Sequence, residues 1–241
     1  MKSIIVTGAS GGLGALTAEL FLKNGWRVGM IARSQDKLEE VANGAENAVL
    51  LPCDVTNEDQ VVNAFDQFDG TLDVLFNNAG SFGVAATIDE ITLSEWQRVV
   101  DVNLTGMFLC ARAAFARMRH QKPQGGRIIN NGSISATTPR PGSVSYTSTK
   151  HAISGMTKTI ALDGRPFSIA CGQIDIGNAA SAMTSQMSGG VPQADGSIKP
   201  EPVMAADNVS STVFHMANLP LDANILNVTV MASDMPFVGR G

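Results

Sequence analysis

The chain has 241 residues, of which 44% are hydrophobic and 16% are charged, and its formal net charge at pH 7 is −5. This composition excludes a disordered chain, and the length suits one α/β domain with a substantial core. Because no run of Lys or Arg is present, we expect neither a nucleic-acid partner nor an anionic membrane partner.

The predicted elements alternate between short apolar runs, typical of strands, and longer segments with helical periodicity. Strands are predicted, in chain order, at SIIVTG, RVGMIA, NAVLLPC, LDVLFNNAG, GRIINNGS, FSIACGQI and ILNVTVM. Helices are predicted at about 12–24, 35–42, 58–68, 93–121, 145–163 and 207–218. Continuous apolar strands that alternate with helices indicate a parallel sheet covered on both faces. The sequence therefore predicts one domain over 1–241, with a doubly wound α/β fold of the Rossmann type and about seven strands.

One segment, at about 175–205, interrupts this alternation. It contains Gly189, Gly190 and three prolines, and it is too long for a routine connection. Long ordered loops are often lids or binding loops, so we expect a substrate lid here. The alternative is a mobile surface excursion.

Glycines cluster where the first strand meets the first helix, in VTGASGGLG, at Gly8, Gly12 and Gly14. Glycine lets backbone amides approach a pyrophosphate closely, and the helix N-terminus adds positive potential. The pattern predicts a dinucleotide site, although its spacing differs from the commoner Gly-x-Gly-x-x-Gly. The alternative is a tight turn without a ligand.

The end of the second strand distinguishes NAD from NADP. An acidic residue about 20 residues past the glycines would bind the ribose hydroxyls of NAD. The chain instead has Ala32 and Arg33 there, in MIARSQDK. A guanidinium can hold a phosphate by two parallel hydrogen bonds, so we expect NADP(H) with Arg33 on the 2′-phosphate. The alternative is a solvated surface arginine.

Tyr146 is the only tyrosine in the chain, and Lys150 follows it by four residues on a predicted helix. Residues at this spacing share a helix face, so the two side chains can form an acid-base pair. A free phenol has a pKa of about 10. We expect the Lys150 cation to lower the Tyr146 pKa toward neutrality, where acid-base catalysis is most efficient, with desolvation offsetting part of the effect.

Six motifs occur in one order along the chain: TGASGGLG (7–14), CDVT (53–56), NNAG (77–80), VNLTG (102–106), NGSIS (131–135) and YTSTK (146–150). With these motifs the chain resembles the classical short-chain dehydrogenase/reductases from end to end. The resemblance implies a catalytic tetrad of Asn103, Ser133, Tyr146 and Lys150. It assigns Ser133 to the substrate oxygen, Lys150 to the nicotinamide ribose as well as to the phenol, and Asn103 to a water that relays protons.

The resemblance also implies a set of residues around the cofactor. They are Gly8, Ser10, Gly11, Gly12, Leu13, Gly14, Arg33, Asp54, Val55, Asn78, Ala79, Gly80, Tyr146, Lys150, Ile176 and Ala179. Asp54 and Val55 are implied at the adenine end, and Asn78 to Gly80 on the ribose side. After the sixth strand the family commonly has Pro-Gly and then Thr, whereas this chain has Asp175-Ile176-Gly177 and Ser181. We expect the Ile176 amide and the Ser181 hydroxyl to preserve the nicotinamide anchor.

Apolar residues on two faces of the predicted helix at 93–121 suggest burial on both sides. One stripe is Leu104, Phe108, Ala111, Phe115 and Met118, and the other is Met107, Cys110 and Ala114. In the family this helix and the helix that carries the tyrosine pair between subunits, so the resemblance implies a homodimer or homotetramer. Packing within one chain is the alternative.

The remaining signals concern metals and location. No histidine has a carboxylate or a cysteine at metal-ligand spacing, so we expect no metal. Cys53, Cys110 and Cys171 lack paired spacing, which predicts buried, reduced thiols in a cytoplasmic protein. The N-terminal apolar run is too short for a signal peptide, and no stretch approaches the roughly 18 apolar residues of a membrane span.

These observations together predict a cytoplasmic NADPH-dependent carbonyl reductase that also works reversibly as an alcohol dehydrogenase. The expected substrate is a ketone, an aldehyde or a 3-oxoacyl compound. The alternative is a non-catalytic NADP(H)-binding sensor or scaffold protein. Such a protein can keep the glycine loop while losing the tetrad.

Overall fold

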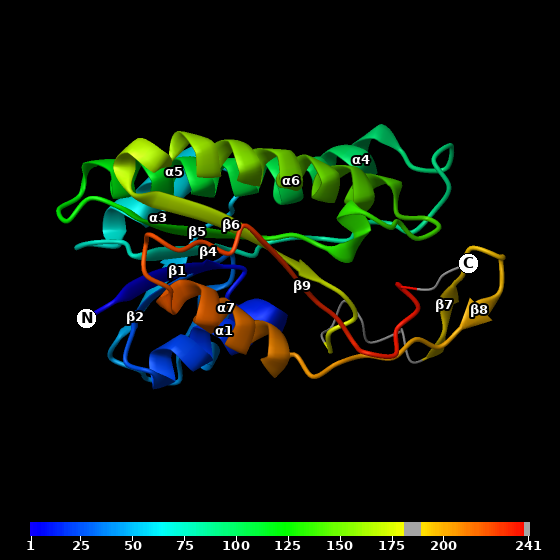
Figure 1. Cartoon of the computed structure of the whole chain (residues 1–241), viewed down its shortest axis with the longest axis horizontal. Helices are drawn as coiled ribbons and strands as arrows, with labels where there is room; N and C mark the ends of the chain where they lie inside the picture. Colours follow the sequence, from blue (N-terminus) through cyan, green and yellow to red (C-terminus); the bar gives the residue numbers. More distant parts are fainter. Residues whose placement is uncertain (181–188, 239–241) are drawn as a thin grey trace.

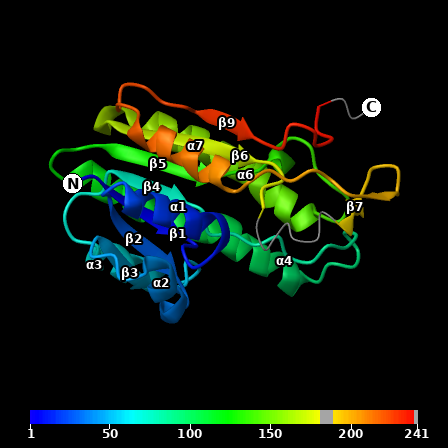
Figure 2. The ribbon, with the colours of Figure 1, turned by 90° about the horizontal axis from the view of Figure 1, so that it is seen from below.

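The computed structural model describes residues 1–180 and 189–238 of the chain. Its centre is a seven-stranded sheet in the order β3-β2-β1-β4-β5-β6-β9, in which every pairing is parallel (Figure 2). The strands are β1 (Ser3–Thr7), β2 (Arg27–Ala32), β3 (Ala48–Pro52), β4 (Val74–Asn77), β5 (Gly126–Asn131), β6 (Ile169–Ile176) and β9 (Asn227–Val230). The predicted doubly wound Rossmann-type fold is confirmed.

Helices cover both faces of the sheet, with α5 and α6 on one face and α1 and α7 on the other (Figure 1). The helices are α1 (Gly12–Lys23), α2 (Gln35–Ala42), α3 (Glu58–Gln67), α4 (Leu93–Val100), α5 (Met107–His120), α6 (Val144–Asp163) and α7 (Asp207–Asn218). Successive strand residues point to opposite faces. Ile4 therefore packs in the layer of α1, α2 and α7, and Ile5 packs in the layer of α3 and α5. Because both layers are apolar, the strands are continuous apolar runs.

The order of the strands reverses at β1, which pairs with β2 on one side and with β4 on the other. Thr7, at the carboxyl end of β1, accepts hydrogen bonds through its Oγ1 from the backbone N–H groups of Asn78 (2.8 Å) and Ala79 (2.9 Å). The ends of β1 and β4 are thereby joined. Ligands of doubly wound sheets bind at such a switch point, so the fold places its crevice here.

The predicted helix at 93–121 consists of three consecutive helical segments, namely α4, a π-helical turn and α5. Thr92 and Glu95 form a capping box at the start of α4, and a π-helical turn (Asp101–Gly106) separates α4 from α5. Inside that turn, the buried Asn103 clamps the backbone of Ser81: its Oδ1 accepts from the Ser81 N–H (2.7 Å), and its Nδ2 donates to the Ser81 carbonyl (2.8 Å). Turns of this type inside α-helices frequently mark functional sites.

The helical stretch Leu93–His120 is also long and apolar enough, by length and composition, to cross a membrane. In this fold, 44% of its most apolar window is buried, and α5 packs against α3, β4 and β5. Core helices of soluble proteins can have the same length and composition. The expected absence of a membrane partner stays a prediction.

The predicted lid begins inside the sheet, because Asp175 and Ile176 are the last residues of β6. Further on, β7 (Val191–Pro192) and β8 (Ile198–Lys199) form a small antiparallel hairpin that stands away from the main sheet (Figure 1). Residues 181–188 lie outside the described residues, so the lid itself stays a prediction.

Candidate active site

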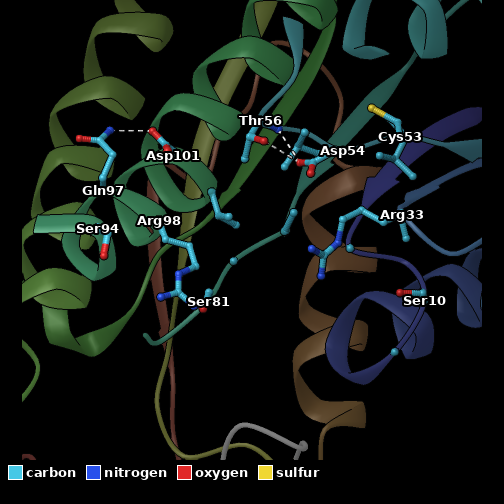
Figure 3. A pocket seen from close by; sticks show the side chains of 18 residues that line it. Ser10, Arg33, Cys53, Asp54, Thr56, Ser81, Ser94, Gln97, Arg98 and Asp101 are labelled. Atoms are coloured by element: carbon cyan, nitrogen blue, oxygen red, sulfur yellow. Dashed lines mark hydrogen bonds between the residues drawn. The ribbon is translucent and has the colours of Figure 1, made fainter. Parts of the chain in front are cut away.

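Two adjoining cavities lie along the switch point of the sheet. The first cavity has a volume of about 710 Å³ and is lined by the glycine loop, the ends of β2 and β3, and α4 (Figure 3). The second cavity has a volume of about 410 Å³ and is lined by the glycine loop, the ends of β5 and β6, and the start of α6. Gly8, Ser10, Gly11, Ala79 and Gly80 line both, so the two cavities meet along the glycine loop.

The glycine loop has no room for side chains at two positions. A Cβ atom at position 14 would lie 2.2 Å from the carbonyl oxygen of Gly8. Gly8 itself has φ +70°, and a Cβ atom there would lie 3.0 Å from the Asn78 side chain. These contacts bring the backbone of the loop against the start of α1 and the end of β4. The result is an open cradle of backbone amides at a helix N-terminus, the arrangement that binds phosphates.

The first cavity contains the residues predicted at the adenine end. Figure 3 shows Arg33 reaching in from the end of β2, with Arg98 of α4 on the opposite wall. The carboxylate of Asp54 accepts hydrogen bonds from the Thr56 N–H (3.0 Å) and the Thr56 hydroxyl (2.8 Å). Asp54 thus stabilises the turn after β3 and also lines the cavity.

Every predicted cofactor residue except Gly14 lines one of the two cavities. Gly14 lies behind the loop, where its missing side chain permits the close approach to Gly8. Ile176 and Ala179 line the second cavity beside Tyr146 and Lys150. Ser181, expected to help anchor the nicotinamide, lies outside the described residues.

Two of the four predicted catalytic residues, Tyr146 and Lys150, line the second cavity, and Ser133 directly follows its lining residue Gly132. Ser133 follows β5, and its side chain interacts with the Tyr146 side chain. Tyr146 and Lys150 lie on α6, with the Lys150 Nζ 5.4 Å from the centre of the Tyr146 ring. The Nζ donates a hydrogen bond to the backbone carbonyl of Asn131, at 2.7 Å. The ends of β5 and the first turns of α6 therefore assemble a hydroxyl, a phenol and an amine.

Asn103 is connected to the same centre through the side chain of Thr149. Its Nδ2 donates to the Thr149 hydroxyl (3.2 Å), which in turn donates to the backbone carbonyl of Tyr146 (2.8 Å). The π-helical turn is thus tied to the turn of α6 that carries the phenol. The structure brings all four predicted residues to one place.

The pKa of Tyr146 is shifted in the direction opposite to the prediction. Burial raises the pKa of Tyr146; the interaction with the Ser133 side chain opposes this shift, and the negative charge of Asp175 adds to it. Burial also lowers the pKa of Lys150 to about 8, against the influence of Asp175. The prediction that Lys150 brings the Tyr146 pKa down toward neutrality is therefore wrong for this structure. Desolvation of the phenolate is the largest cause of the raised pKa.

Comparison with known proteins identifies the family. The family model described as short chain dehydrogenase matches residues 2–190. The chain belongs to the short-chain dehydrogenase/reductase family. A 3beta-hydroxysteroid dehydrogenase from Mediterraneibacter gnavus is 34% identical to this chain over 180 residues, which are 72% of this chain and 64% of that protein. The matches to the first four curated relatives span only 60–66% of the relatives' own lengths.

Solved structures show the same fold over nearly the whole of this chain. A 3-ketoacyl-(acyl-carrier-protein) reductase from Brucella melitensis complexed with NADH has a TM-score of 0.85 at 23% identity, covering 97% of this chain and 98% of that one. The closed form of a serine dehydrogenase complexed with NADP+ has a TM-score of 0.87 at 21% identity, covering 99% and 98%. At these identities the likeness establishes the fold.

Three residues of the candidate site were not predicted from the sequence. Asn131 holds Lys150 through a backbone carbonyl, for which the sequence carries no signal. Phe82 packs against Tyr146, with 5.1 Å between the ring centres. Asp175 influences both Tyr146 and Lys150. A signal for Asp175 does exist, since Gln173 and Asp175 are polar residues within an otherwise apolar central strand.

The expected absence of a metal stays a prediction. In the described part of the chain, no group of three or more His, Cys, Asp or Glu side chains is placed to hold a metal ion. Cys53, Cys110 and Cys171 are buried free thiols, as predicted. Burial raises the pKa of Cys53 to about 11 and that of Cys171 to about 12, which makes both thiols poor nucleophiles.

Proposed function

We propose that the protein is an NADPH-dependent carbonyl reductase, which also oxidises the corresponding alcohol in the reverse direction. The observation that carries the proposal is that Tyr146 and Lys150 line a cavity at the glycine loop, and that the Ser133 side chain interacts with Tyr146. The substrate classes proposed are ketones, aldehydes and 3-oxoacyl compounds. Relatives named for steroid and serine oxidation are consistent with a carbonyl or alcohol substrate.

The residues around the two cavities fit a nicotinamide dinucleotide. The side-chain-free cradle at Gly8 and Gly14 suits a pyrophosphate, and the first cavity has room for an adenosine group. Arg33 would hold the 2′-phosphate, which supports NADP(H) over NAD(H). Lys150, Ile176 and Ala179 would hold the nicotinamide end. When bound, the cofactor supplies the hydride that is transferred to the carbonyl carbon.

The chain's own residues provide the proton and the charge stabilisation. As hydride arrives at carbon, negative charge develops on the carbonyl oxygen. The Ser133 hydroxyl donates a hydrogen bond to that oxygen and holds it beside the phenol. Tyr146, protonated because its pKa is raised by burial, donates the proton from its Oη. Lys150 stabilises the phenolate that remains, and Asn103 supports the route by which the phenol regains a proton.

We also propose that the protein is a homo-oligomer, as a dimer or tetramer, through the outer faces of α5 and α6. An apolar groove of about 720 Å³ lies there, lined among others by Phe108, Phe115, Met156 and Ile160. Cys110 and Ala114, from the second apolar stripe of α5, pack against the sheet, whereas Phe108 is 48% exposed. Packing within the chain thus accounts for one stripe and leaves part of the other uncovered.

A panel of ketones, aldehydes and 3-oxoacyl thioesters with purified protein and NADPH tests the proposed activity, with NADPH absorbance as the readout. We expect turnover of at least one class, and loss of that turnover in Tyr146→Phe. NADPH binding without turnover of any member would instead favour the non-catalytic sensor or scaffold.

A further inference from the structure

A buried carboxylate lies directly behind the catalytic centre, at the end of β6. Asp175 is 6% exposed. Its Oδ1 accepts hydrogen bonds from the backbone N–H of Ser133 (2.9 Å) and from Gln173 Nε2 (2.7 Å), and its Oδ2 accepts from Asn227 Nδ2 (2.7 Å). N–H donors on both oxygens are the partners of an ionised carboxylate. Asp175 has no role in the proton transfer proposed for Ser133, Tyr146, Lys150 and Asn103.

The carboxylate packs against the turn that holds two catalytic groups. A Cβ atom on Gly132 would lie 2.1 Å from Asp175 Oδ1, so the carboxylate occupies the space of a side chain at that position. One residue before Gly132, the carbonyl of Asn131 accepts the Lys150 ammonium; one residue after it, the N–H of Ser133 donates to Asp175. The ammonium and the carboxylate therefore bind the same three-residue turn.

The groups around Asp175 identify its electrostatic partner. Two titratable groups whose pKa this carboxylate influences are Tyr146 and Lys150, both from α6. Its direct hydrogen-bond partners from β6, β9 and the turn after β5 are neutral. A buried charge is costly unless an opposite charge compensates it. Lys150 is the cation in position to do so.

Hydrogen bonds connect the carboxylate to the turn after β5, to β9 and, through Gln173, to α6. Gln173 donates to Ser154 Oγ (3.0 Å) as well as to Asp175, and it accepts from the Thr157 hydroxyl (3.2 Å). Both partners lie on α6, so the side chains of β6 bind the helix that carries Tyr146 and Lys150. Asp175 is thereby held in one orientation relative to the phenol and the amine.

We propose that Asp175 is a positioning residue of the catalytic centre: its buried carboxylate fixes the turn at Ser133 and serves as the counter-charge of Lys150. The role rests on the proposed reductase function. With a negative charge held nearby, the phenol keeps its proton and the amine keeps its charge. Carbonyl reduction needs a protonated phenol as the proton donor and a charged amine to stabilise the phenolate that forms. Asp175 therefore favours the reductive direction.

The lone tyrosine provides a direct test that needs no substrate. Because Tyr146 is the only tyrosine, the phenolate absorbance of the cofactor-free protein reports its ionisation alone, and Tyr146→Phe supplies the baseline. Asp175→Asn removes the charge with little change of shape, and Asp175→Ser keeps a hydroxyl acceptor near Ser133. The matched control is Asp73→Asn, since Asp73 accepts from the Ser3 N–H (2.7 Å) at the opposite edge of the sheet.

We expect both Asp175 variants to lower the midpoint of phenolate formation by about one pH unit. Equivalently, at a pH below the midpoint where circular dichroism shows all proteins folded, their phenolate fraction should be about tenfold higher. Asp73→Asn should match the wild type. In the activity assay, the optimum for carbonyl reduction should move to lower pH in the Asp175 variants.

An unchanged titration in folded Asp175 variants would overturn the proposal and assign the carboxylate to the framework. Failure of both variants to fold would lead to the same conclusion. A shifted titration in a protein that reduces no carbonyl would keep the role of Asp175 toward Tyr146 and reject the proposed reductase activity instead. The two failures are therefore distinguishable.

Discussion

Gly14, in the first turn of α1, lies so close to Gly8 that a Cβ atom at position 14 would stand 2.2 Å from the Gly8 carbonyl oxygen. Backbone cannot yield to such a contact cheaply, so Gly14→Ala should lower the free energy of unfolding by about 1–3 kcal/mol. Thermal unfolding without cofactor measures this loss. Gly11→Ala is the control, because a Cβ atom at position 11 meets nothing within 4 Å. Equal melting temperatures for the two variants would contradict the close approach.

Tyr146→Phe should reduce kcat for carbonyl reduction by at least about 100-fold, since it removes the proton donor. NADPH binding, followed by fluorescence titration, should remain within about twofold of the wild type. Ser148→Ala, an exposed position on the same helix, is the control for effects on α6. Retained reductase activity in Tyr146→Phe would refute the assignment.

Arg33→Ala should weaken NADPH binding by about 10- to 100-fold and leave NADH binding nearly unchanged, because a charge-assisted pair with the 2′-phosphate contributes about 1.5–3 kcal/mol. Calorimetry with both cofactors gives the two affinities. Arg33→Lys keeps the charge without the planar fork and should retain part of the preference. An unchanged NADPH-over-NADH ratio in Arg33→Ala would exclude the proposed role.

The buried Lys150 should make stability depend on alkaline pH. Its pKa is lowered to about 8 in the folded protein, against about 10.4 in an unfolded chain. Between these values the unfolded state binds more protons, so the free energy of unfolding should rise with pH, by roughly 2–3 kcal/mol across the window. Below pH 8 both states are protonated and this gain is absent.

Urea unfolding at the two ends of that window measures the effect. Lys150→Met lacks the titrating group and should lose the rise. At neutral pH the variant should be inactive and less stable than the wild type, because it leaves the buried Asp175 carboxylate without its counter-charge. The same rise in Lys150→Met as in the wild type would assign the titration to another group.

The groove between α5 and α6 should form the contact between subunits. Phe108→Glu places a charge at a side chain that is 48% exposed and should shift the protein toward a monomer. Light scattering at micromolar concentration reports the mass. Leu221→Glu, at a position of similar exposure (45%) outside the groove, should not change it. A monomeric wild type would contradict the proposal directly.

The sequence by itself determined the architecture and the positions of the site. The fold follows from local patterns, because continuous apolar strands such as SIIVT need cover on both faces and the glycines mark one strand end. The spacing of Tyr146 and Lys150 follows from helix geometry alone. Local helical periodicity also predicted the boundaries of α2 and α7 to the residue.

Only the tertiary structure decided the protonation states of Tyr146 and Lys150 and the position of the π-helical turn between α4 and α5. The π-helical turn depends on the clamp between Asn103 and Ser81, which are 22 residues apart. The pKa of Tyr146 depends on burial and on Asp175, which reaches the phenol from another strand. Solvation and long-range charge are properties of the packed molecule. The helix spacing could therefore predict the pair, while the folded surroundings set its protonation.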